Sequence, residues 1–96
     1  MNRELDNQGR LQIPKKLLEL TNLQELTGSK LLICKSTEGY FLREFLEENL
    51  QGLIIVGLGR MDKKGRIFLK NIFPPGTHFE ISVYNGDIYF TPKILK

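Results

Sequence analysis

The chain has 96 residues, of which 41% are hydrophobic and 26% are charged, as in a globular protein rather than a disordered one. The formal net charge is +3, which is compatible with a polyanionic partner but does not require one. The longest apolar run, at 53–56, is far too short to span a membrane, and residues 1–4 do not open a signal peptide, so we expect a cytoplasmic protein with no membrane partner.

The first elements of the chain surround a pattern that occurs twice. Residues 5–13 and 61–69 both read apolar, Asp, two polar residues, Gly-Arg, apolar, any residue, apolar, and the copies lie 56 residues apart. Asp accepts hydrogen bonds from nearby backbone N–H groups, Gly adopts positive φ, and alternation indicates a half-buried strand. Each copy therefore predicts a strand, a tight loop that ends in Arg, and a second strand, with the loop structured by Asp6 and Gly9 or by Asp62 and Gly65.

A helix is expected directly after the first copy. Pro14 suits the first position of a helix, and the composition of 14–20 is helical. The apolar face is predicted from leucines that recur every third residue, namely Leu17, Leu20, Leu23 and Leu26. The helix ends near Leu20 or continues as far as Gly28, a suitable stop.

A hairpin is predicted from 31–34 and 40–42, with Gly39 in the turn, but its register stays open. Residues 44–50 suit a short helix in an acidic connector. The single cysteine, Cys34, excludes an intramolecular disulfide, fits a reducing compartment and is interpreted as a small buried hydrophobe.

The second half of the chain begins with an apolar strand at 53–56 and has no helix after its loop, since 70–73 runs into the breaker Pro74-Pro75-Gly76. Asn85-Gly86 predicts a type I′ hairpin. It pairs Val83 with Ile88 and Ile81 with Phe90, places Tyr84 and Tyr89 on the other face as candidates for base stacking, and ends at Thr91-Pro92.

The fold class predicted is mainly β with short helices. We expect a single domain, 1–96, made of two tandem repeats at about 2–44 and 53–92, joined by the acidic connector 45–52. Gly28 corresponds to Gly76, an offset of 48, so the first repeat has eight more residues between loop and hairpin. Because neither repeat has enough core alone, the two should close on each other into one barrel, and a homo-oligomer is possible.

These residues resemble a known family. The stretch 5–14, followed by a leucine-rich helix and a hairpin, resembles the AbrB superfamily, and the two copies in one chain look most like the tandem arrangement of MraZ-type regulators. The resemblance implies a swapped-hairpin, cradle-loop β-barrel and a transcription regulator that binds double-stranded DNA. It also implies that the basic residues of the motif face DNA, namely Arg3 and Arg10 in the first copy and Arg60 and Arg66 in the second.

Positive charge is concentrated around the second copy. Residues 59–75 contain five cations against one carboxylate, whereas 36–51 contain four carboxylates against one cation. Five cations in one short segment are typical of a nucleic-acid contact. The candidate DNA-binding residues are therefore Arg60, Lys63, Lys64, Arg66 and Lys70, with Arg3, Arg10, Lys15 and Lys16 in the first repeat.

Two alternatives stay open. Arg10 and Arg66 either pair with Asp6 and Asp62 inside their own loops or contact phosphates and bases. The whole protein is either a DNA-binding regulator or a protein-interaction or assembly module on the same barrel.

An enzyme is not expected. The lone His78 begins a strand and is interpreted as an edge residue, and Cys34 belongs to no Cys-x-x-Cys motif, so no metal site or cofactor is predicted. No nucleophile elbow, Walker A loop or dinucleotide motif is present.

Overall fold

The computed structural model describes residues 1–21, 28, 30–45 and 52–93, and it is mainly β, as predicted. The elements in these residues are β1 (Asn2–Glu4), β2 (Arg10–Gln12), α1 (Lys15–Leu18), β3 (Lys30–Ser36), β4 (Gly39–Glu44), β5 (Ile54–Arg60), β6 (Arg66–Phe68), β7 (His78–Tyr84) and β8 (Asp87–Lys93). Within this part of the chain, no helix is long and apolar enough to cross a membrane.

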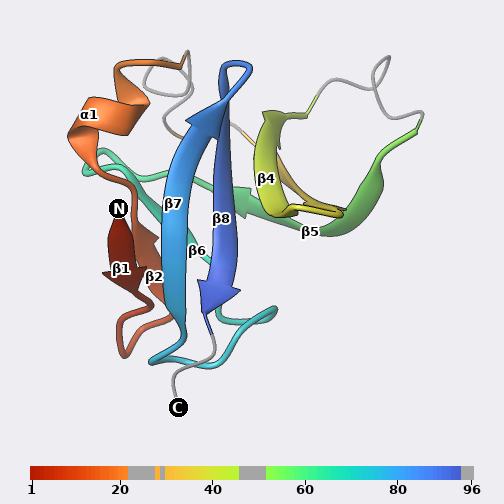
Figure 1. Ribbon diagram of the computed structural model, residues 1–96. Coiled ribbons are helices and arrows are strands. Elements are labelled where there is room, and N and C mark those ends of the chain that lie inside the picture. The colour runs from red at the N-terminus through yellow and green to blue at the C-terminus, as the bar shows by residue number, and fades with distance from the viewer. Residues whose placement is uncertain (22–27, 29, 46–51, 94–96) are drawn as a thin grey trace.

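Six strands form one antiparallel sheet in the order β1-β7-β8-β4-β3-β5, and β2 and β6 form a separate antiparallel ribbon. Figure 1 shows the long β7–β8 pair at the centre, with β1 to one side and β4 and β5 to the other. Among the described strands, hydrogen bonding does not close the sheet into a barrel, because β1 and β5 are its two edges.

The first strand of each predicted repeat pairs with the hairpin of the other. β1 pairs with β7, where Glu4 lies opposite His78, and β5 pairs with β3, where Arg60 lies opposite Lys30. Arg60 follows Glu4 by 56 residues, and His78 follows Lys30 by 48. These are the two offsets found in the sequence, so an approximate two-fold axis relates one half of the sheet to the other.

The approximate two-fold axis passes through two pairs of residues. Phe41 of β4 lies opposite Tyr89 of β8, 48 residues later, with ring centroids 5.2 Å apart. Leu11 of β2 lies opposite Ile67 of β6, 56 residues later, and both are fully buried. The β2–β6 ribbon therefore crosses the molecule symmetrically, on the same axis as the centre of the sheet.

The main core lies between the β2–β6 ribbon and the sheet. It combines apolar residues from both layers, among them Leu11, Ile67, Ile33, Phe79 and Phe90. Successive side chains of a strand point to opposite faces, so the ribbon residues that point into the core alternate with residues that point outward.

The β7–β8 hairpin forms as predicted. Asn85 and Gly86 both have positive φ, 51° and 82°, and Val83 lies opposite Ile88. The prediction that the strand ends at Thr91-Pro92 is wrong, because β8 continues to Lys93. Pro92 lies opposite Phe79, at a position of the β7–β8 pair where a backbone N–H would point away from β7. Proline, which has no N–H, therefore removes no hydrogen bond between these two strands.

The register of the β3–β4 hairpin, which the sequence left open, is set by the pair Ser36–Gly39, so the loop has two residues. This register turns Ile33 toward the main core. Cys34 then packs on the other face of the sheet, in a second small cluster with Leu32 and Phe41. Cys34 is a fully buried free thiol, as interpreted from the sequence, and burial raises its pKa.

The helix after the first loop differs from the prediction. It spans only four residues, and Pro14 precedes it as the cap rather than occupying its first position. Leu18 is buried, whereas Leu20, which was predicted to face the core, is 65% exposed. A single turn has no continuous face, so three-residue spacing does not decide which side chain is buried. The predicted continuation through Leu23 and Leu26 lies outside the described residues.

The predicted helix at 44–50 is wrong at its first residue, since Glu44 is the last residue of β4. Residues 46–50 lie outside the described part of the chain.

The expectation that no helix follows the second loop is confirmed. There the N–H groups of Ile72 and Phe73 both donate to the carbonyl of Leu69, which makes one turn before Pro74.

Candidate nucleic-acid interface

The first loop is organised by the side chain of Asp6. Its Oδ1 accepts hydrogen bonds from the backbone N–H groups of Gln8 at 2.9 Å and Arg10 at 2.8 Å, and its Oδ2 accepts from Arg10 Nε at 2.9 Å. Gly9 adopts the positive φ of 80° that this turn needs. The loop thus holds the guanidinium of Arg10 in one direction.

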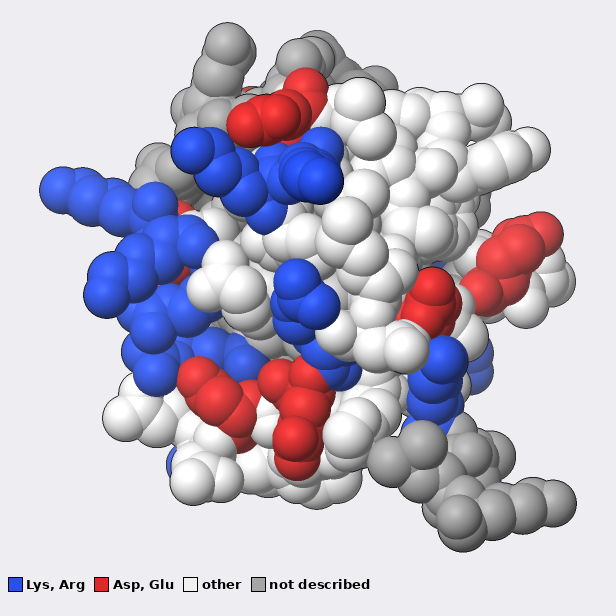
Figure 2. Space-filling view, turned by 60° about the vertical axis from the view of Figure 1, so that its left-hand side comes forward, with Lys and Arg blue, Asp and Glu red and all other residues white. Residues whose placement is uncertain are grey.

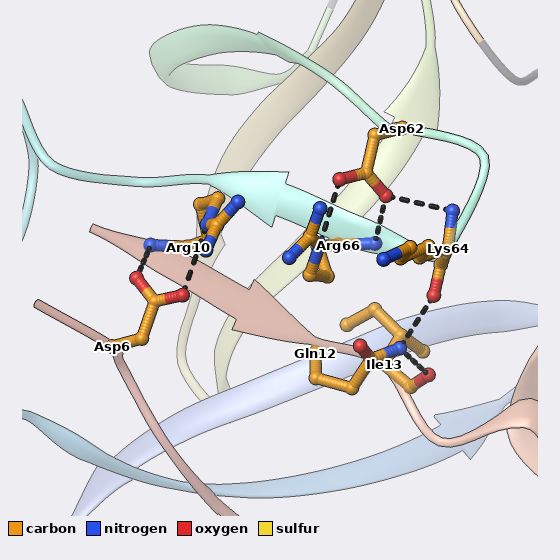
Figure 3. Close-up of polar contacts among 7 residues, drawn as sticks. All are labelled: Asp6, Arg10, Gln12, Ile13, Asp62, Lys64 and Arg66. Carbon is orange, nitrogen blue, oxygen red and sulfur yellow. Dashed lines mark hydrogen bonds and ion pairs between the residues drawn. The ribbon is translucent and has the colours of Figure 1, made fainter. Parts of the chain in front are cut away.

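The second loop repeats these contacts with the residues 56 positions later. Oδ1 of Asp62 accepts from the N–H groups of Lys64 at 2.9 Å and Arg66 at 3.0 Å, and Oδ2 accepts from Arg66 Nε at 2.7 Å. Gly65 has φ 78°. Figure 3 shows the two Asp–Arg pairs on the same ribbon. The intra-loop ion pairs left open by the sequence are therefore both present.

Both carboxylates are held in the charged form. Hydrogen bonds from the backbone N–H and side chain of Arg10 hold the pKa of Asp6 below its ordinary value. Burial acts to raise the pKa of Asp62, but hydrogen bonds from Arg66 and Lys64 outweigh burial and hold this pKa below its ordinary value. These two residues are loop-structuring groups, as predicted from the sequence, and both loops keep their form at neutral pH.

The two arginines project from the outer face of the β2–β6 ribbon. In the ribbon register Arg10 lies opposite Phe68 and Arg66 lies opposite Gln12, while the alternate positions Leu11 and Ile67 are buried. Only Nε of each arginine is used by its aspartate. Within the described residues, the Nη atoms of both arginines have no hydrogen-bond partner, so each guanidinium keeps donors for a ligand.

The ribbon also ties each loop to the other repeat. The N–H of Ile13 donates to the carbonyl of Gly65 at 2.9 Å, and the equivalent N–H of Leu69 donates to the carbonyl of Gly9 at 2.7 Å. Gln12 adds a bond from Nε2 to the carbonyl of Lys64 at 2.7 Å (Figure 3). Each loop therefore lies beside the chain that leaves the ribbon in the other repeat.

This crossing brings three predicted lysines together. Lys15 from α1 and Lys63 and Lys64 from the second loop line one cavity of about 330 Å³, with Gln12 and Leu18 among its walls. All three lysines are exposed. Figure 2 shows the side of the molecule that carries α1 and β1 in Figure 1, and Lys and Arg side chains gather along one margin of that view.

The other predicted cations lie elsewhere. Lys70 was expected to flank the second loop, but it packs against Gly9 of the first loop, where a Cβ on the glycine would overlap its side chain. Arg60 donates from Nη1 to the carbonyl of Gly28 at 2.7 Å and lines a separate hollow with Phe68. Arg3 is exposed on the edge strand β1, and Lys16 is exposed on α1.

Two residues of this surface were not predicted as site residues. Gln12 and Phe68 lie on the outer face between the arginines, and Phe68 is 46% exposed. The sequence contained a signal for both residues. Each occupies the middle position of an apolar, any, apolar segment, and the alternation of side chains along a strand turns this position outward.

Tyr84 and Tyr89 lie on the outer face of β7–β8, as predicted, with ring centroids 6.0 Å apart. Glu38 lines the same hollow as both tyrosines. Burial, together with the negative charges of Asp87 and Glu38, raises the pKa of Tyr89. Arg43 acts on this pKa in the opposite direction, and it pairs with Asp87 at 2.7 Å.

In the described part of the chain, no cluster of three His, Cys, Asp or Glu residues could hold a metal ion. His78 lies at the start of β7, with Nε2 3.9 Å from Glu4 on the neighbouring edge strand.

No family model, curated protein or solved structure matches the chain. The resemblance of the two Asp-x-x-Gly-Arg segments to the AbrB superfamily stays a prediction. The function of the protein is therefore inferred from its own residues and geometry.

Proposed function

We propose that this protein is a non-enzymatic, DNA-binding regulator of transcription that contacts duplex DNA through the outer face of the β2–β6 ribbon and its flanking loops. The observation that carries the proposal is the pair Arg10 and Arg66. Each is fixed through Nε by an aspartate and keeps its terminal donors on one outward face.

The dimensions of this surface suit the major groove, which admits a two-stranded antiparallel ribbon. Arg10 and Arg66 are offset by two residues along the ribbon, or roughly 7 Å at strand rise, similar to about two base-pair steps. Arginine is the most common reader of guanine, through O6 and N7. Since the aspartates already order both side chains, less conformational entropy is lost on binding.

The interleaving of the two repeats supports the swapped-hairpin architecture implied by the resemblance. In that architecture the strands and loops of one unit complete the other unit. Here β1 of the first repeat pairs with β7 of the second, and β5 of the second repeat pairs with β3 of the first. We extend the proposal to this fold: a cradle-loop barrel in which one chain supplies both units.

The proposal is tested by selecting duplexes from a random double-stranded library with the full chain and measuring the affinity of the recovered sequence. Enrichment of a defined motif that contains guanines, and weaker binding by Arg10→Ala and Arg66→Ala variants that remain folded, are the expected results. Recovery of no duplex above background contradicts the proposal.

A second candidate function, assembly, is favoured by the edge strand β5. Its side chains Ile54, Val56 and Leu58 are 65%, 38% and 55% exposed, and apolar edge strands favour strand pairing. A second copy of the chain could pair its β5 antiparallel to this one. Light scattering tests this: a dimer that Val56→Lys disrupts supports assembly, and a monomer at high concentration excludes it.

A further inference from the structure

The approximate two-fold axis relates the backbones of the two loops but not their charges. Lys63 and Lys64 of the second loop correspond, 56 residues earlier, to Asn7 and Gln8 of the first. All four are exposed at the turn of their loop. The fold makes the two turns equivalent, and the sequence makes one cationic and the other neutral.

A third lysine also corresponds to a neutral residue in the other repeat. Lys15 of α1 lines the cavity beside Lys63 and Lys64. The residue 56 positions after Lys15 is Asn71. At the first loop, Lys70 of the other repeat packs against Gly9. The cavity at the second loop is therefore lined by two lysines of that loop and by one from the other repeat, whereas the first loop has Asn7 and Gln8 at the equivalent positions.

The charge of this three-lysine cavity is not compensated from within. Asp62 also lines the cavity, but both of its carboxylate oxygens are used by the N–H groups of the loop and by Arg66. No ion pair among the described residues involves Lys15, Lys63 or Lys64. A cavity lined by three lysine side chains suits a phosphate group, which lysine binds as a point charge.

Resting on the DNA-binding function proposed above, we infer that the three-lysine cavity binds a backbone phosphate on one side of the approximate two-fold axis only. The protein then recognises a non-palindromic duplex in a single orientation. A symmetric dimer presents the same groups to both half-sites, and its operator mirrors that symmetry. Here Arg10 and Arg66 are equivalent, but the phosphate contact is not.

The outer face of the ribbon adds to the asymmetry. Gln12 and Phe68 are equivalent positions on that face. Phe68 offers an apolar contact of the kind made with a thymine methyl group, whereas Gln12 is an amide already bonded to the carbonyl of Lys64. The base edges next to the two arginines therefore meet different side chains.

Ethylation interference on the duplex selected with the wild-type protein tests the inference directly. The expected result is strong interference at phosphates beyond one end of the ribbon site and weak interference beyond the other, on a motif without two-fold symmetry. A symmetric interference pattern on a palindromic motif overturns the inference.

Variants locate the phosphate site. In the triple variant Lys15→Gln, Lys63→Gln, Lys64→Gln, the interference beyond that end should disappear and affinity at low salt should fall about tenfold or more. The slope of log affinity against log salt should become less steep by about 0.9 for each phosphate that the variant no longer neutralises. The reverse variant Asn7→Lys, Gln8→Lys should add interference at the other end.

Lys35→Gln is the matched control, because Lys35 is an exposed cation on β3 outside the cavity. If the triple variant weakens binding no more than the control does per charge, the cavity is not a phosphate site and the inference fails while the proposed function stands. If the wild-type protein binds no duplex at all, both fail.

Discussion

Leu11 and Ile67 lie opposite each other at the centre of the β2–β6 ribbon, both fully buried, and the second is the repeat equivalent of the first. This pair lies on the approximate two-fold axis and joins the two repeats beneath the outward-facing arginines. The stability of the ribbon and the position of the candidate site therefore depend on the same contact.

Ile67→Ala should reduce the free energy of unfolding by about 2–5 kcal/mol, because it leaves a cavity in the core. Its neighbour Phe68 is the matched control, since Phe68→Ala on the exposed face should change stability by only about 0.5 kcal/mol. Urea denaturation of both variants provides the comparison. Equal losses would mean that the ribbon is not packed on the core as described.

Gly65 should tolerate alanine less well than Gly86. Both have φ near 80°, but a Cβ at Gly65 would lie 2.7 Å from Leu18 Cδ1, whereas a Cβ at Gly86 meets nothing within 4 Å. Gly86→Ala should cost about 1 kcal/mol for the backbone alone, and Gly65→Ala about 2–3 kcal/mol. Thermal unfolding measures both. In a Leu18→Ala background the extra cost at Gly65 should shrink, and an undiminished cost would argue against this contact.

Acid should weaken the two loops. The folded-state pKa values of Asp6 and Asp62 are lowered, so their contribution is present above the ordinary value of 3.8 and is lost as pH falls through the lower folded values. Between about pH 5 and pH 3, an Asp6→Asn, Asp62→Asn variant should therefore lose less stability than the wild-type protein. The N-terminal amine also lowers the pKa of Glu80, but both proteins contain Glu80, so its contribution does not affect the comparison. Parallel losses in chemical denaturation would show that the aspartates contribute nothing.

Arg66→Lys separates the structural role of the arginine from recognition. Lysine keeps the charge but cannot offer Nε to Asp62 and two terminal donors to a base at once. We expect a loss of about 1–3 kcal/mol in discrimination at one base position, measured with single-base variants of the selected duplex. Arg10→Lys should affect a different position. If both variants lower the melting temperature and leave selectivity unchanged, the arginines are structural only.

Local chemistry explains what the sequence could predict. Asp6 and Asp62 bond to backbone groups within four residues, and Asn85-Gly86 sets its hairpin through its own φ angles. Such features need no information from distant residues. The predictions that rest on them were therefore correct, including the pairing of Val83 with Ile88. The ion pairs, which the sequence left open, form within both loops.

The exchange between repeats could not be read from the sequence in the same way. The pairing of β1 with β7 depends on which distant strand offers a free edge, and no local pattern specifies it. The same crossing moved Lys70 to the first loop and brought Lys15 to the second. Lys63 and Lys64 are exposed, but the grouping of the cations depends on contacts between residues about 50 positions apart.

The central claim, that this protein binds duplex DNA through a cationic ribbon surface, is tested most directly by measuring its affinity for the selected duplex over a series of salt concentrations. The proposal predicts a linear fall of log affinity with log salt concentration, with a steep negative slope. No binding at low salt, or an affinity that does not change with salt, would contradict it.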